Sequence, residues 1–194
     1  MSTIESIRTA VRSRRPGTVI SAASILGAGS REAVDQALGR LARSGELMRI
    51  ARGKYVRPQS GRFGSYPPPA TKVIKSLAKA QGKAIVESGA VSANRLGLTT
   101  QQPVRQVFMT TGKSGELKLG NNPILLRHVP AWQTMFANRP AGQALRALAY
   151  MGKAESGEAA KRIKGSLEAA EWEALMRAKK KFPAWVSKAL EGAA

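Results

Sequence analysis

The sequence has 194 residues, with 32 Lys and Arg against 12 Asp and Glu and a formal net charge of +20. Its hydrophobic content of 43% is enough for ordinary globular cores, so we do not expect a disordered chain. There is no cysteine and only one histidine, His128, which excludes disulfides, thiolate metal sites and histidine-based metal clusters and leaves no expected cofactor or metal.

The excess of positive charge would make the chain self-repelling unless a polyanion binds it, and nucleic acid is the leading candidate. The net charge is +7 over residues 1–60, +8 over residues 61–130 and +5 over the remainder, so the partner is expected to touch more than one part of the chain. No apolar run approaches the ~20 residues that span a bilayer, and the N-terminus lacks the apolar core of a signal peptide. We therefore expect a cytoplasmic protein without a membrane partner.

The first predicted helix covers residues 2–13, where Ile7 and Val11 fall on one face and Ser2 with Glu5 matches a capping box. A short strand over Thr18–Ile20 follows. Ser21 then caps a brief second helix that runs through Leu26, and Gly27–Gly29 form a turn.

Residues 30–57 contain the strongest pattern of the chain. Val34, Leu38 and Leu41 lie on one apolar stripe at helical spacing, Ser30 is a good N-cap, and Gly45 follows the last turn. Strands over 47–52 and 54–57, joined by a tight turn at Arg52 and Gly53, follow directly. A helix that runs into a basic hairpin is typical of a winged helix-turn-helix, so residues 1–57 are predicted to form such a DNA-binding domain.

The polar side chains of this helix and hairpin are of the types that contact DNA. Gln36 and Arg43 project opposite the apolar stripe, with Arg40 on the flank and Arg31 in the first turn. Arg and Gln pair with guanine and adenine edges in the major groove, whereas Arg52 and Lys54 at the hairpin turn suit phosphates or a minor groove. The alternative is a solvated helix face, and the basic hairpin beside it favours DNA.

Residues 58–69 hold four prolines and are predicted to be a linker. Phe63 and Tyr66 within it are expected to anchor it to a domain, with stacking on a partner as the alternative. Residues 70–194 are then predicted to form a mixed α+β domain. Its expected elements are helices over 70–82 and 88–98, strands over 83–86, 104–110, 116–119 and 124–129, and Ala-rich C-terminal helices within 131–194, over 138–151, 156–165, 168–180 and 182–191.

An enzyme site is not expected. The stretch TTGKSGE, residues 110–116, lacks the earlier glycine of a phosphate-binding loop and is expected to be a hairpin turn. His128 could pair with Glu87 or Glu116 for acid–base chemistry, but a single histidine at a strand end is more often structural or exposed. Clustered carboxylates that would hold a catalytic metal are not apparent.

The order of these stretches resembles the AbiEi family of antitoxins and transcriptional autoregulators from bacterial type IV toxin-antitoxin systems. The resemblance covers about residues 5–130. It is carried by GSREAVDQALGRLARSGELMRIARGKYVRP and by SGAVSANRLGLTTQQPVRQVFMTTGKSGELKLGNNPILLRHV, separated by the Pro-rich link.

The resemblance implies that the N-terminal winged helix binds inverted repeats in its own promoter and represses an operon that also encodes a nucleotidyltransferase-like toxin. Two-fold operators favour a dimer on the DNA, with a monomer on each half-site as the alternative. It implies that the C-terminal domain counters that toxin, without necessarily forming a stable complex with it. The DNA-facing positions that match are Ser30, Arg31, Gln36, Arg40, Arg43, Arg52 and Lys54. The alternative is a general DNA- or RNA-binding protein without antitoxin activity, because a charge of +20 gives affinity for any nucleic acid.

Overall fold

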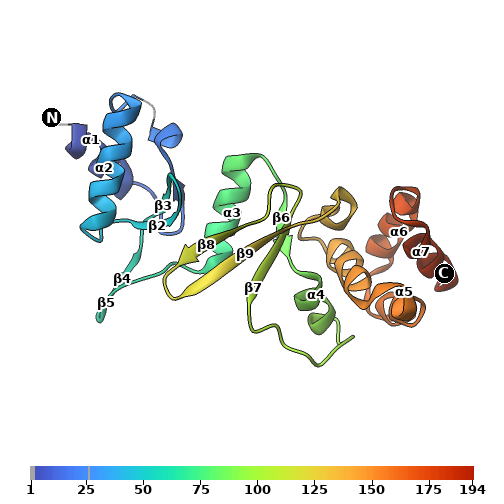
Figure 1. Cartoon of the computed structure of the whole chain (residues 1–194). Helices are drawn as coiled ribbons and strands as arrows, with labels where there is room; N and C mark the ends of the chain where they lie inside the picture. The colour runs from blue at the N-terminus through green and yellow to red at the C-terminus, as the bar shows by residue number, and fades with distance from the viewer. Residues whose placement is uncertain (1–2, 26) are drawn as a thin grey trace. The chain divides into compact units, whose positions relative to one another are not determined.

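The computed structural model describes residues 3–25 and 27–194. Its described part is a mixed α+β chain with seven α-helices and small antiparallel sheets, as predicted at the level of fold class (Figure 1). The chain divides into two compact units. The first contains Met1–Lys83 and Gly115–Leu125, and the second contains Ala84–Ser114 and Leu126–Ala194.

The first unit begins with two helices that share a core. Helix α1 covers Thr3–Arg12 and helix α2 covers Arg31–Arg43. Their apolar stripes meet because Ile7 and Leu38 are both fully buried in one cluster. Between them the predicted second helix is a single 3-10 turn, η1 (Ala22–Ile25). The expected cap at Ser2 and the expected end at Leu26 lie outside the described residues.

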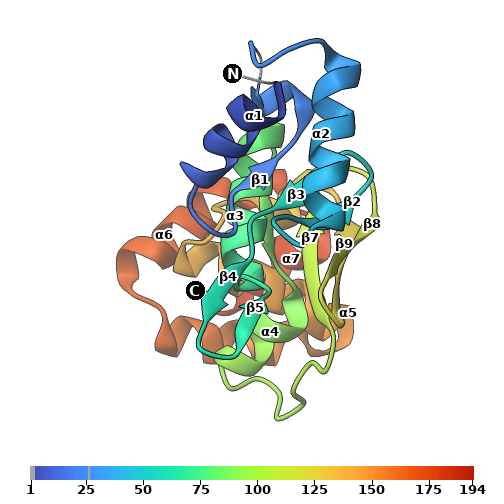
Figure 2. The same cartoon turned by 90° about the vertical axis from the view of Figure 1, so that its left-hand side faces the viewer.

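A three-stranded sheet completes this core. Strand β1 (Val19–Ile20) pairs with β3 (Lys54–Val56), which pairs with β2 (Met48–Ala51), both antiparallel. The predicted tight turn between β2 and β3 is present, because Gly53 has a φ of +65°, a left-handed conformation that favours glycine. The sheet, η1 and the two helices therefore form one small layered body (Figure 2).

The Pro-rich segment is not a plain linker. It contains a two-stranded antiparallel hairpin, β4 (Gln59–Gly61) and β5 (Gly64–Tyr66). Phe63 at the hairpin turn is 90% exposed and contacts the Arg62 guanidinium, 4.5 Å from the ring centroid. The expectation that Phe63 anchors the segment to a domain is therefore wrong, because the turn carries its ring into solvent.

The boundary between the compact units does not follow this segment. Helix α3 (Ala70–Gln81) belongs to the first unit; its Ser76 hydroxyl accepts a hydrogen bond of 2.8 Å from the backbone N–H of Val19 in β1. Strand β8 (Gly115–Leu119) also belongs to it and lies beside β2. Gly120, directly after β8, approaches Pro67 so closely that an added methyl group would lie 2.6 Å from the proline ring.

The remaining strands form a third sheet with the order β6-β7-β9-β8. Strand β6 covers Ile85–Glu87, β7 covers Gln106–Thr110 and β9 covers Asn122–His128. The predicted strands all exist. Their order, however, is not sequential, because the last strand in the chain, β9, lies between β7 and β8.

Helices dominate the second unit. Its helical elements are α4 (Gly89–Arg95), η2 (Ala131–Thr134), α5 (Pro140–Ser166), α6 (Ala169–Ala178), η3 (Lys179–Lys181) and α7 (Ala184–Gly192). Helix α5 is interrupted at Gly152, whose φ of 78° and ψ of 176° are not helical. This confirms the predicted break between two helices at this position. Trp172, Phe182 and Leu190 pack into one helical core. No described helix is both long and apolar enough to cross a membrane.

Candidate nucleic-acid interface

Helix α2 is fixed in place by its cap and its apolar stripe. The Ser30 hydroxyl accepts a hydrogen bond of 3.3 Å from the backbone N–H of Ala33, which satisfies one of the free donors at the helix start. Val34, Leu38 and Leu41 are buried. The opposite face of the helix is therefore held rigidly toward solvent.

The seven predicted DNA-facing residues all belong to the first compact unit, and none of them is in the core. Lys54 is partly buried on β3, and the other six are exposed. These six are Ser30, Arg31, Gln36, Arg40, Arg43 and Arg52. The outward face of α2 is not purely cationic, because Glu32 and Asp35 are exposed on it as well.

Most of the cations among these residues are uncommitted. Within residues 3–25 and 27–194, no ion pair or hydrogen bond engages the side chains of Arg31, Arg40, Arg52 or Lys54. Arg43 makes only a long hydrogen bond of 3.5 Å, from its Nε to the carbonyl of Gly39. Their charge is therefore available to a partner without breaking an internal contact.

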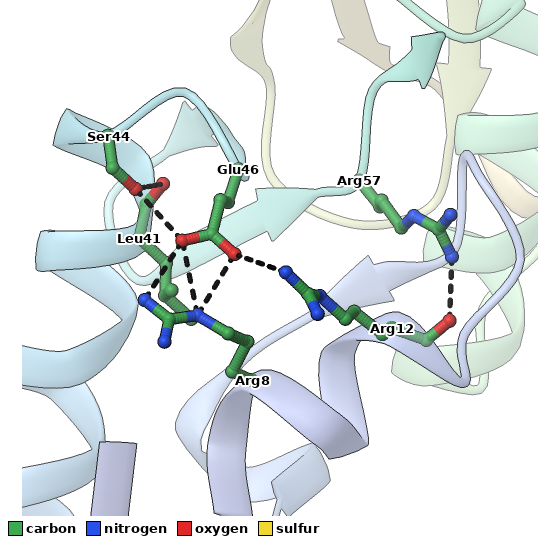
Figure 3. Close-up of polar contacts among 6 residues, drawn as sticks. All are labelled: Arg8, Arg12, Leu41, Ser44, Glu46 and Arg57. Atoms are coloured by element: carbon green, nitrogen blue, oxygen red, sulfur yellow. Dashed lines mark hydrogen bonds and ion pairs between the residues drawn. The ribbon is translucent and has the colours of Figure 1, made fainter. Parts of the chain in front are cut away.

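Other arginines of the same unit have structural partners (Figure 3). Glu46, between α2 and β2, accepts hydrogen bonds of 3.0 and 3.1 Å from Arg8 of α1 and lies 3.7 Å from the Arg12 guanidinium. Arg57, directly after β3, donates to the backbone carbonyls of Arg12 and Arg14 at 2.6 and 3.1 Å. These side chains hold α1, the end of α2 and the hairpin together.

Two features of this surface were not predicted. Arg49 on β2 is exposed between the partly buried Met48 and the buried Ile50, and the alternation of the strand could have indicated it. Gly39 lies on the outward side of α2, where an added methyl group would meet no atom of the chain within 4 Å. A glycine inside a helix costs about 1 kcal/mol relative to alanine, and internal packing does not require it here.

The stretches considered for catalysis have ordinary surroundings. Residues 111–114 of TTGKSGE connect β7 to β8. The expected hairpin turn is wrong, because β9 lies between β7 and β8 in the sheet and the two strands do not pair with each other. The exposed His128 has its Nδ1 2.8 Å from the Gly112 carbonyl, while its backbone N–H donates to the Ser114 hydroxyl at 2.9 Å. No group of three or more metal-ligating side chains is present among the described residues.

Comparisons with known proteins identify one matching family model and one solved structure of low similarity. A family model, described as a family of unknown function (DUF6088), matches residues 6–175. No curated protein matches the chain. Among solved structures, the chain is similar to the crystal structure of RV2827C protein from Mycobacterium tuberculosis, with 16% sequence identity, a TM-score of 0.47, and coverage of 100% of this chain and 82% of that one.

Proposed function

We propose that the chain, which belongs to the family of unknown function DUF6088, is a sequence-specific transcriptional repressor that binds double-stranded DNA. In this proposal the first unit is a winged helix-turn-helix. Helix α2 is its recognition helix, and the β2–β3 hairpin is its wing.

One observation carries the proposal. A rigid helix presents an amide side chain and uncommitted guanidinium groups to solvent, and it continues directly into a hairpin whose turn carries two further unpaired cations, Arg52 and Lys54. The major groove admits an α-helix, and Arg and Gln are the residue types that read guanine and adenine edges there. Gln36 and Arg40 are the proposed base readers. Arg52 and Lys54 are the proposed phosphate contacts.

The second candidate is a general DNA- or RNA-binding protein. It is favoured by the charge of +20 and by the number of uncommitted cations, since phosphate contacts alone give non-specific affinity. The amide of Gln36 on the outward face favours sequence reading, because an uncharged side chain adds nothing to the charge attraction that dominates non-specific binding.

Single substitutions separate these two candidates. Gln36→Ala should weaken binding to the operator by ~1–3 kcal/mol if the amide makes a good base contact and should leave binding to random DNA unchanged. Lys54→Ala should weaken binding to both DNAs by the same factor. Titrations of the full chain with labelled operator and scrambled duplexes measure both effects. Equal losses on both duplexes for Gln36→Ala would contradict the assignment of α2 as the recognition helix.

From the resemblance to AbiEi antitoxins we further propose that the chain represses its own operon at inverted repeats, with two copies on the two-fold DNA, and that it opposes a nucleotidyltransferase-like toxin in the cytoplasm. It is not proposed to be an enzyme. Co-expression with the product of the neighbouring toxin-like gene tests the antitoxin role. Restored growth supports that role, whereas unrelieved toxicity at a level of the chain that still represses the promoter leaves a repressor only.

A further inference from the structure

We propose that the second compact unit holds a binding pocket for a small organic phosphate of the nucleotide class. The pocket has a volume of about 710 Å³ and lies entirely within this unit. Volumes of roughly 300–1,000 Å³ are typical of small-molecule sites. The inference does not depend on DNA binding by the first unit.

The charge of the pocket indicates an anionic ligand. Arg105, Arg127 and Arg146 line it together with His128, and no Asp or Glu is among its lining residues. Arg105 and Arg127 are exposed, and neither forms an ion pair with any part of the chain that the structure describes. Their guanidinium groups can therefore pair bidentately with phosphate oxygens.

Arg146 strengthens this assignment because it is a buried charge that forms no ion pair with any described residue. Only 1% of its surface is exposed. Its Nη1 donates to the Ala137 carbonyl at 2.8 Å, but its Nε is buried with no hydrogen-bond partner in the described structure. The nearby carboxylate of Glu87 is instead paired with Arg95, at 2.5 Å.

A buried guanidinium that lacks a paired carboxylate costs stability unless something compensates its charge. Burial lowers the pKa of Arg146 to about 10 despite the field of Glu87, so the group still carries its charge at neutral pH. A bound anion in a pocket that Arg146 lines would supply the missing negative charge.

The backbone around the pocket is built tightly. Gly89 at the start of α4 lies so close to α5 that an added methyl group would be 2.5 Å from the Arg146 carbonyl and 2.9 Å from Tyr150 Cβ. The close packing of α4 on α5 thus fixes the wall that carries Arg146 and Tyr150.

The remaining lining indicates what is attached to the phosphate. Val107 and Met109 of β7, with Pro103, Val104 and Pro130, form an apolar wall. Tyr150 adds an aromatic ring that is 44% exposed. Val104 is 99% exposed beside the pocket, which leaves apolar surface uncovered there. A ligand that joins a phosphate to a flat, weakly polar body fits both the cationic and the apolar residues of this lining.

Calorimetric titration of the full chain with adenosine 5′-monophosphate tests the proposal, with adenosine and inorganic phosphate as separate ligands. We expect saturable binding of the nucleotide, at least about tenfold tighter than either fragment, which corresponds to ~1.4 kcal/mol. Arg127→Ala and Arg105→Ala should each weaken it about fivefold or more, because a charge-assisted bidentate contact is lost. Both residues are exposed, so these variants should remain folded.

Lys180→Ala is the matched control, since it removes an exposed cation of the same unit that does not line the pocket; it should leave nucleotide binding unchanged. The proposal is overturned if the nucleotide shows no saturable binding up to ~5 mM, if Lys180→Ala weakens binding as much as Arg127→Ala, or if either fragment binds as tightly as the nucleotide. Displacement of the nucleotide by scrambled duplex DNA would also overturn it, because the lining would then be a DNA phosphate contact. None of these results bears on the operator titrations that test DNA reading by the first unit.

Discussion

Replacing Gly39 by alanine should change the stability and the DNA affinity of this protein in opposite directions. Gly39 is the ninth of the 13 residues of α2, and its φ is not among the positive values. A methyl group there would meet no atom within 4 Å, so alanine fits the free protein without strain. The exchange should therefore add about 1 kcal/mol of stability, because alanine loses less conformational entropy in a helix.

On DNA the same methyl group would lie on the outward face of α2, in the same helical region as Gln36, Arg40 and Arg43. If this face enters the major groove, the added methyl keeps the backbone from its closest approach to the base edges. We expect operator affinity to fall about fivefold or more, which corresponds to ~1 kcal/mol, while the melting temperature rises by ~4–8 °C for a unit of this size.

Thermal unfolding and operator titration of the same preparation measure the two effects. Gly157→Ala is the control, because Gly157 is also a helical glycine at which an added methyl group would meet no atom within 4 Å. It is exposed and lies in α5 of the other unit. It should change the stability without changing DNA binding. If Gly39→Ala stabilises the protein and leaves operator affinity unchanged, α2 does not enter the groove and the reasoning fails.

Two further predictions concern stability. Glu46→Gln should lower the free energy of unfolding of the first unit by about 1 kcal/mol or less, because the ion pairs with Arg8 and Arg12 are partly solvated; chemical denaturation measures it, and an unchanged ratio of operator to random-DNA affinity is expected. Glu171 accepts hydrogen bonds from Arg139 and from the Ala141 backbone at 2.8 and 2.9 Å, and these bonds lower the pKa of its carboxyl group in the folded state from the ordinary value of a glutamate. The ionised Glu171 carboxylate therefore stabilises the folded protein at neutral pH, and this stabilisation is lost as the pH falls through the lowered pKa. The Glu171→Gln variant should be less stable than the natural protein at pH 7 and equally stable in strong acid. A stability difference that is the same at both pH values would contradict the role of the Glu171 charge.

Local sequence patterns predicted the elements of this chain better than their assembly. The stripe of Val34 and Leu38, the cap at Ser30 and the breaks at Gly53 and Gly152 each depend on neighbours within a few residues, and each is where the pattern indicates. The order of the strands in the sheets could not be predicted from such local patterns. The position of β9 in the middle of its sheet and of β8 beside β2 depends on contacts between residues far apart in the chain, which periodicity does not encode.

The candidate sites show the same limit. Composition and helical spacing indicated the exposed cations of α2, because exposure follows from a single periodic face. Which arginines are already paired could not be predicted, since the partner of Arg8 is Glu46, 38 residues away. The pocket around Arg146 was missed for the same reason. Its lining comes from α4, α5, β7 with the segment before it, and β9 with the segment after it, whereas the sequence placed Arg146 only in an Ala-rich helix.

The ratio of affinities for DNA from directly upstream of the chain's own gene and for a scrambled duplex of equal length and composition, measured at one fixed salt concentration, tests the central proposal most directly. Sequence-specific regulators prefer their sites by about 10³-fold or more, and we expect a ratio of that order here, falling in Gln36→Ala but not in Lys54→Ala. A ratio near one would contradict sequence-specific repression and leave a general nucleic-acid-binding protein.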